Sequence, residues 1–542
     1  MVSARRARGW RCVLAFTLAF GCWKDAKAQS PRANPVEALR QTLVSDSDRA
    51  TRGADITARV AALKSLNDLH HALFLREWRD HHPDPEVALV DQKYRALVGK
   101  RFEQMIRPVL RSTDKGLSLR ALEQLDGIAA AEPDGCDPCR LMPAVAADLA
   151  ELTRRGQGEV REAAAKVLGR WHADPEVAVP ALGTLLLTGA TAERVAAAGS
   201  LAQVIEEAAR LVAQPNNSVD VALARRNLIL AARGAVPALA RGVKDKDPEV
   251  RRLCLEGLTA VAQSTQSIVQ AWSLAGTEKD PQAARRQAEK CIGELLPLVR
   301  QINDQEGGCL PATLNDPELQ VRIAALHAVE ELAMFRAEWL RQAREFSVGD
   351  DPLQQILVAT LPALSRNLND RDVNVRRSTL EVLEVLGSTA RPAAANVVRS
   401  LNDPDVFVRW AAARAMGHLA PAEAATAVPA LVKLLSETDS GLRLTAVAAL
   451  ERYGPAAKDA APALVIRLRS QDNDLRRGVV RALGSIAMDS ETASRGLNEA
   501  LKDPSEIVRK SAGEALERLQ AQRKDPGGLL SYHRPPIQSG DR

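Results

Sequence analysis

Between residues 361 and 519 the apolar and polar positions recur every 33 residues, once every 34. Each period contains two stretches with apolar residues at helical spacing, as at Val428, Leu431 and Leu435. A polar turn such as 402–405 separates the two stretches, and its Asp-Pro pair favours the end of one helix and the start of another. The pattern therefore predicts helical hairpins that bury their apolar faces only by stacking on one another, as in a solenoid.

In five successive units, residues of the same type recur at fixed distances from one arginine, which we use as a marker. Two residues after a marker arginine the side chain is always small, and seven residues after it there is a leucine or methionine. Six residues before the arginine there is an acid in four of the five units, with Ser470 in the remaining one. The marker arginines are Arg376, Arg409, Arg443, Arg476 and Arg509, and the aspartates that precede them are Asp370, Asp403 and Asp503. Columns that agree in this way indicate one repeated structural unit.

The period continues upstream with interruptions, which predicts about ten units between residues 108 and 520. We expect repeats at 108–263 and 309–520, separated by a helical insertion at 264–308. Residues 29–107 are predicted to form a helical cap without a clear repeat. Residues 521–542 contain Pro-Gly-Gly and Pro-Pro and are predicted to be a disordered tail.

The phrase from Leu401 to Gly417 resembles the short HEAT repeat of the phycobiliprotein-lyase type, and weaker copies occur around it. The resemblance implies an all-α superhelix with first helices on the convex face and second helices on the concave face. It also implies that turn acids and second-helix arginines form a ladder between adjacent units. The ladder residues would be Asp370, Arg376, Asp403, Arg409, Arg443, Arg476, Asp503 and Arg509.

The formal net charge of +5 comes from the first 28 residues, which hold six basic side chains and one acid. The other residues hold 73 − 6 = 67 basic and 68 − 1 = 67 acidic side chains, so the charge gives no support to nucleic-acid binding. An arginine-rich start, an apolar stretch too short to span a bilayer and small residues at Ala26 and Ala28 are typical of a secretory signal. We therefore expect cleavage between Ala28 and Gln29, and a periplasmic or secreted product without a transmembrane segment.

Catalytic motifs are hard to find in this sequence. No histidine is followed by glutamate, as the iron-binding HEAT-like hydroxylases require, and no HExxH, phosphate-binding loop or Gly-x-Ser-x-Gly elbow occurs. The pairs His70-His71 and His81-His82 lie too far apart on a helix for one metal ion. Cys136 and Cys139 could form a local disulfide or a free thiol pair. We predict a chain that is not an enzyme and has no cofactor, metal or small-molecule substrate. The alternative is a lyase-like or metal-binding enzyme with a site in residues 33–107 or at this cysteine pair.

If the second helices line a groove, the positions one and five residues after each ladder arginine should face it. These positions supply one large aromatic residue and several cations, the residue types that most often dominate protein interfaces. The sequence predicts a protein-binding scaffold in which this strip docks an acidic or extended partner segment; the alternative is that Trp410 only covers an adjacent turn. The candidate partner-binding residues are Arg377, Trp410, Arg414, Arg477, Arg481 and Lys510.

Overall fold

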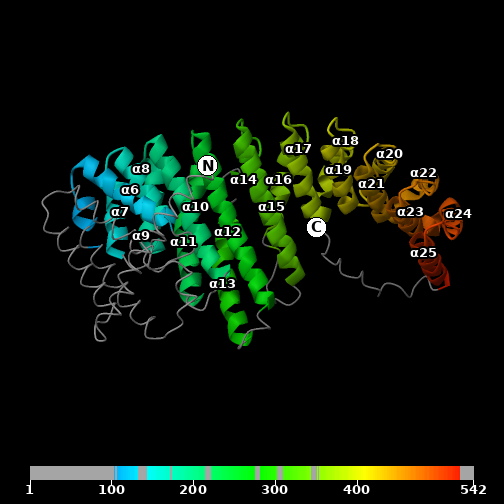
Figure 1. The fold of residues 1–542 in the computed structure, drawn as a ribbon, viewed down its shortest axis with the longest axis horizontal. Helices are drawn as coiled ribbons and strands as arrows, with labels where there is room; N and C mark the ends of the chain where they lie inside the picture. The colour runs from blue at the N-terminus through cyan, green and yellow to red at the C-terminus, as the bar shows by residue number, and fades with distance from the viewer. Residues whose placement is uncertain are drawn as a thin grey trace, which may run out of the picture. The chain divides into compact units, whose positions relative to one another are not determined.

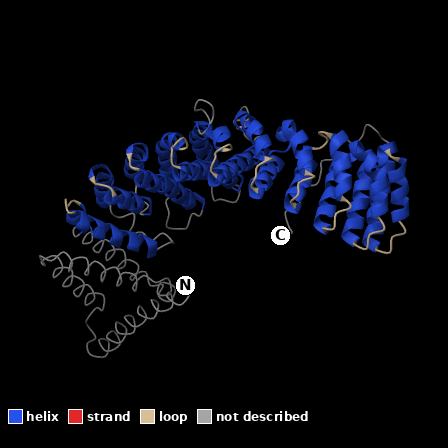
Figure 2. Ribbon diagram, turned by 90° about the horizontal axis from the view of Figure 1, so that it is seen from above, coloured by secondary structure: helices blue, strands red, loops and turns tan. Residues whose placement is uncertain are grey.

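The computed structural model describes residues 103, 106–131, 143–170, 174–213, 221–274, 281–301, 309–342, 351 and 353–524. Within these residues every regular element is a helix (Figure 2). The chain divides into two compact units, residues 1–301 and 302–542, which are described separately below. The predicted signal at 1–28 and the tail beyond Lys524 lie outside the described residues, as does the predicted cap at 29–107 apart from residues 103, 106 and 107.

The first unit is a stack of helices in two layers. Helices α6, α8, α10 and α12 pack successively against one another, and α7, α9, α11 and α13 form the second series. The elements are α6 (Lys115–Ala131), α7 (Pro143–Arg155), α8 (Glu159–Arg170), α9 (Pro175–Thr188), α10 (Thr191–Ala213), α11 (Val221–Gly242), α12 (Pro248–Leu274) and α13 (Pro281–Gln301).

The second unit repeats this arrangement with shorter helices that follow one another in chain order (Figure 1). Its first helices are α14 (Cys309–Thr313), α16 (Gln354–Asn367), α18 (Ala394–Ser400), α20 (Ala424–Leu434), α22 (Ala461–Arg467) and α24 (Glu491–Ala500). Its second helices are α15 (Leu319–Gln342), α17 (Val373–Leu386), α19 (Val406–Leu419), α21 (Ser440–Tyr453), α23 (Asn473–Ile486) and α25 (Glu506–Lys524). The 3-10 turns η3 (Gly387–Ala393), η4 (Gly454–Ala460) and η5 (Ala487–Asp489) lead from a second helix toward the next first helix.

The second helices begin where the sequence supplies a capping aspartate. Asp372, Asp405 and Asp472 each accept hydrogen bonds from two backbone N–H groups of the first helical turn, which satisfies donors that have no partner inside the helix. Helices α17 and α21 are followed by Gly387 and Gly454, whose positive φ angles of 54° and 55° suit glycine. Local sequence thus sets both ends of these helices.

The core of the second unit is one continuous apolar layer between the two helix series. The residue just before each ladder arginine is almost fully buried, at Val375, Val408, Leu442, Leu475 and Val508. Each such side chain contributes roughly 1.5–3 kcal/mol when it leaves water. The all-α helical-repeat solenoid predicted from the sequence is confirmed by this packing within the unit. No helix in the described part of the chain is long and apolar enough to cross a membrane.

Two of the predicted boundaries fall inside helices. The start of the predicted helical insertion, residue 264, lies within α12, which continues unbroken to Leu274. The polar run at 263–267 remains helical, and the hydroxyl groups of Thr265 and Ser267 donate to the carbonyl groups four residues earlier, at Val261 and Gln263. At the other end, α25 continues past residue 520 to Lys524.

Candidate partner-binding face

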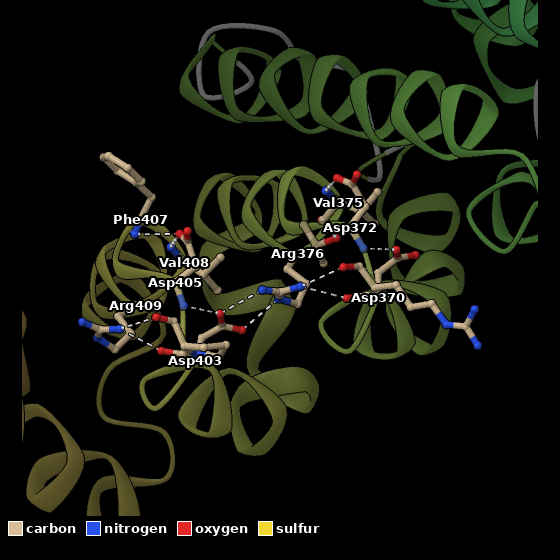
Figure 3. A network of polar contacts seen from close by, with 12 residues as sticks. Asp370, Asp372, Val375, Arg376, Asp403, Asp405, Phe407, Val408 and Arg409 are labelled. Atoms are coloured by element: carbon tan, nitrogen blue, oxygen red, sulfur yellow. Dashed lines mark hydrogen bonds and ion pairs between the residues drawn. The ribbon is translucent and has the colours of Figure 1, made fainter.

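The turns of the second unit are joined by arginine–carboxylate contacts (Figure 3). Nε and Nη2 of Arg376 donate to the two carboxylate oxygens of Asp403 in the next unit, at 2.8 and 3.0 Å. Nη1 of the same arginine donates to the carbonyl oxygen of Asp370 in its own turn, at 3.0 Å. One planar guanidinium group therefore ties its own turn to the following one.

The same contact recurs along the array. Arg476 holds Asp503 at 2.8 and 3.0 Å, and Arg322 lies 2.8 Å from Asp370. In the first unit, Arg194 donates to Asp245 at 2.8 and 2.9 Å. The partner acid always follows its arginine along the chain, so the ladder runs forward from each unit to the next.

The ladder weakens in the middle of the second unit. Arg409 makes a single contact of 3.2 Å with Glu437, whose side chain is 31% exposed. Arg443 donates to the carbonyl oxygens of Glu437 and Thr438, both at 2.8 Å, but contacts no carboxylate among the described residues. Twenty-seven residues after Arg443, where the other units have an acid, the chain has Ser470. Arg509, in the last unit, donates to the carbonyl oxygens of Asp503 and Pro504.

The Arg476–Asp503 pair is the most buried of these contacts, with side chains 7% and 5% exposed. The hydrogen bonds from Arg476 lower the pKa of the Asp503 carboxyl group, and burial opposes them. The Arg476 pKa is raised mainly by the same hydrogen bonds. Both groups therefore remain charged, and the pair serves to join α23 to α25.

The exposed side of the second helices, turned away from the first helices, carries the residues predicted to bind a partner. We call this side the outer face. Arg414 lies on α19 and its Nη2 donates to Glu384 of α17 at 2.8 Å. Arg481 of α23 donates to Glu451 of α21 at 3.3 Å. Both pairs join the position five residues after a ladder arginine to the position eight residues after the preceding one. They form a second set of contacts between units, on the helices rather than the turns.

The other predicted cations on this face differ in their contacts. Arg377 lies 3.7 Å from Glu381, and Arg477 lies 3.3 Å from Asp474. Lys510 is exposed in the second turn of α25 and contacts no carboxylate among the described residues. Four of the five predicted cations therefore already have an acid beside them, and the strip is much less basic than its arginine content indicates.

The Trp410 ring contacts Arg414, which belongs to one of the two ion pairs between second helices. The Arg414 guanidinium carbon lies 4.6 Å from the centre of the Trp410 ring, in a cation–π arrangement. Leu444 has the same position on α21 as Trp410 has on α19, and its side chain is 39% exposed. Gly478 of α23 lies beside Leu444, and a Cβ atom there would make an ordinary van der Waals contact of 3.4 Å with a Leu444 methyl carbon. Trp410, Leu444 and Ala448 form what we call the apolar window.

His418 borders the apolar window on the side of Glu384. Its Nε2 atom lies 3.4 Å from the Glu384 carboxylate, which Arg414 also contacts. Burial lowers the pKa of His418, and the nearby Arg452 lowers it further, more than Glu384 raises it. The ring is therefore mainly neutral at neutral pH, and His418 adds no positive charge beside the window.

A family model for HEAT repeats matches the chain in three overlapping stretches, residues 360–451, 401–478 and 428–517. These stretches contain the repeating columns, the turn ladder and the apolar window. Residues 360–517 are HEAT repeats.

The chain is also similar to several solved structures. A designed armadillo repeat protein is 21% identical, with a TM-score of 0.31, and the match covers 39% of this chain and 98% of that one. Kap95p, in a structure with RanGDP, is 14% identical with a TM-score of 0.44 over 91% of this chain, and importin beta is 16% identical with a TM-score of 0.44 over 88%. This chain spans 59% of the length of each of these two proteins. No curated protein matches the sequence.

Among the described residues, no group of three or more histidine, cysteine, aspartate or glutamate side chains could hold a metal ion. The His70-His71 and His81-His82 pairs and the Cys136–Cys139 pair lie outside the described residues.

Sequence reasoning missed the acids that neutralise the outer face of the HEAT repeats. Glu384 and Glu451 lie 30 residues before the arginines they contact, which is three fewer than the repeat period. A search for opposite charges at this shorter spacing on successive second helices would have found both pairs.

Proposed function

We propose that the chain is a protein-binding scaffold without catalytic activity and that a partner protein docks on the apolar window. The observation that carries the proposal is Trp410, half-buried on an outer helix face and held in place by Arg414, which Glu384 fixes in turn. An aromatic side chain that is already ordered loses little conformational entropy on binding. The neighbouring Leu444 adds exposed apolar area on the next repeat.

The ion pairs around the window favour a partner that binds through apolar contacts and complementary shape. An acidic partner would have to displace Glu384 or Glu451 from their arginines, and the exchange of one ion pair for another yields little free energy. The acidic docking segment predicted for this strip is therefore less well supported than an apolar or aromatic one. The likeness to phycobiliprotein lyases rests on the Leu401–Gly417 phrase and its weaker copies, which are features of the repeat, and supports no chromophore chemistry.

Trp410→Ala and Leu444→Ala should each reduce the amount of partner captured by the purified full-length protein by about tenfold or more. Val358→Ala is the matched control, because Val358 is an aliphatic side chain on the first helix α16 with a similar exposed fraction, 43% against 39% for Leu444. The circular dichroism spectrum should be unchanged in all three variants. Capture that persists in both window variants would place the binding site elsewhere.

We also propose that the mature scaffold is exported, on the basis of the arginine-rich start, apolar stretch and Ala26–Ala28 site of the leader. N-terminal sequencing of protein purified from the expressing cell tests this proposal. A mature chain beginning at Gln29 supports export, and one beginning at Met1 in the cell interior contradicts it.

A further inference from the structure

The first helices of the HEAT repeats carry an unusual charge. The segments 354–367, 387–400, 424–434 and 454–467, which comprise α16, η3–α18, α20 and η4–α22, contain six basic side chains and a single acid, Asp459, and one further acid, Glu423, lies just before α20. We call the surface made by these six residues the first-helix basic face. They are Arg366, Arg391, Arg399, Lys433, Lys458 and Arg467, and all are exposed except Arg467, which is half-buried.

The cations of the first-helix basic face contact neutral groups where they contact anything. Nε of Arg366 donates to the Asn315 side-chain oxygen at 3.0 Å, and Lys433 donates to that of Asn402 at 3.3 Å. Nη2 of Arg467 donates to the Ser436 hydroxyl at 3.0 Å. No ion pair joins any of the six to a carboxylate in the described part of the chain, in contrast to four of the five cations predicted on the second-helix face.

Four of these residues, which we call the row, lie in the last turn of a first helix, with one cation per repeat. Arg366, Arg399 and Lys433 lie ten residues before the ladder arginine of their repeat, and Arg467 lies nine residues before it, next to the exposed Ile466. Three of them reach back to the same turn position of the preceding repeat, as the contacts to Asn315, Asn402 and Ser436 show. The row stops at α24, where Glu499 occupies the corresponding position.

The helix dipole accounts for only part of this arrangement. A cation near a helix C-terminus is stabilising by a modest amount, which explains why each single position tolerates arginine or lysine. It does not explain why acids are almost missing from four whole segments. Nor is the cation needed for folding, since α24 forms with a glutamate in its place. An array of unneutralised charge at a regular spacing is better explained as a binding surface.

We propose that the first-helix basic face binds an extended, acidic segment of a partner protein. Successive stacked helices lie about 8–10 Å apart. Three residues of polyproline II chain advance about 9 Å, and three residues of β-strand about 10 Å. A segment with an aspartate or glutamate at every third position can therefore place one carboxylate on each cation of the row.

Other anionic partners fit this face less well. The four first-helix segments contain no phenylalanine, tyrosine, tryptophan or histidine. Proteins that bind single-stranded nucleic acid commonly stack bases on aromatic side chains, and membrane-surface helices commonly insert aromatic or leucine anchors. Besides their charges, these helices expose only two large aliphatic side chains among the described residues, Val358 and Ile466. The proposal goes beyond the apolar window, because the two surfaces lie on different helix series and each can fail without the other.

The test measures the fluorescence anisotropy of a labelled synthetic peptide, built from repeats of Glu-Pro-Ser, titrated with the full-length protein. The probe variant combines Arg366→Gln, Arg399→Gln and Lys433→Gln, which removes three charges from the row. The control variant combines Arg377→Gln, Arg477→Gln and Lys510→Gln, which removes three charges from the second-helix face. We expect the first variant to raise the Kd by about tenfold or more and to flatten its salt dependence, and the second to change it by less than about twofold.

Three comparisons complete the design. A peptide of the same composition with its glutamates in one block should bind more weakly than the spaced peptide. Equal binding of the two peptides, equal effects of the two triple variants, or no binding of the spaced peptide would each overturn the proposal. So would tighter binding of a single-stranded oligothymidylate, or of vesicles containing phosphatidylserine, that is lost in the first triple variant. None of these results bears on whether Trp410 and Leu444 bind a partner.

Discussion

Asp403→Ala should lower the free energy of unfolding of the HEAT repeats by about 3–5 kcal/mol and reduce the melting temperature by several degrees. The Asp403 side chain is 8% exposed and that of its partner Arg376 is 14% exposed, so the pair is largely removed from water. The substitution leaves a buried guanidinium group without its carboxylate, and it also removes the acceptor of the Asp405 N–H group. A charge and a backbone donor lose their partners together.

Thermal unfolding followed by circular dichroism measures the effect, and hydrogen exchange locates it. Exchange should accelerate first in the turns after α16 and α18, because the lost contact joins them. The control is Glu437→Ala at the corresponding position of the next repeat. Its single contact of 3.2 Å and its 31% exposure predict a loss under about 1 kcal/mol. Equal melting temperatures for Asp403→Ala and the wild type would show that the turn ladder does not stabilise the array.

The sequence predicted the repeats but not the direction of their contacts. A period of 33 residues places Arg376 near two acids, Asp370 in its own turn and Asp403 in the next. The arginine donates to the backbone carbonyl oxygen of Asp370 and to the carboxylate of Asp403. Spacing alone cannot distinguish these options, because the choice depends on how far the stacked turns are offset.

The outer face was harder to predict for the same reason. Arg414 and Arg481 could be placed on it from their positions, but whether they are neutralised depends on which residues of the preceding helix lie beside them. The first-helix basic face left a clear signal in the sequence, six bases against one acid. That signal emerges only when first and second helices are counted separately, since basic and acidic side chains balance over residues 29–542.

Ser470→Asp should stabilise the HEAT repeats by about 2 kcal/mol, because it would supply the carboxylate that Arg443 lacks. Arg443 already donates from Nη1 to its own turn, as Arg376 and Arg476 do. The Ser470 hydroxyl accepts from the Asp472 N–H group at 3.2 Å, and in other turns a carboxylate accepts the equivalent bond, as at Asp403 and Asp503. The local backbone is therefore suited to an aspartate.

Gln471→Asp is the matched control for this gain, because it adds the same charge at the next, exposed position. It should change the melting temperature little. Combining Ser470→Asp with Arg443→Ala should abolish the stabilisation, since the new carboxylate would have no guanidinium group to accept from. If Ser470→Asp and Gln471→Asp shift the melting temperature equally, the effect is one of net charge. In that case a carboxylate partner for Arg443 would add no stability to this part of the array.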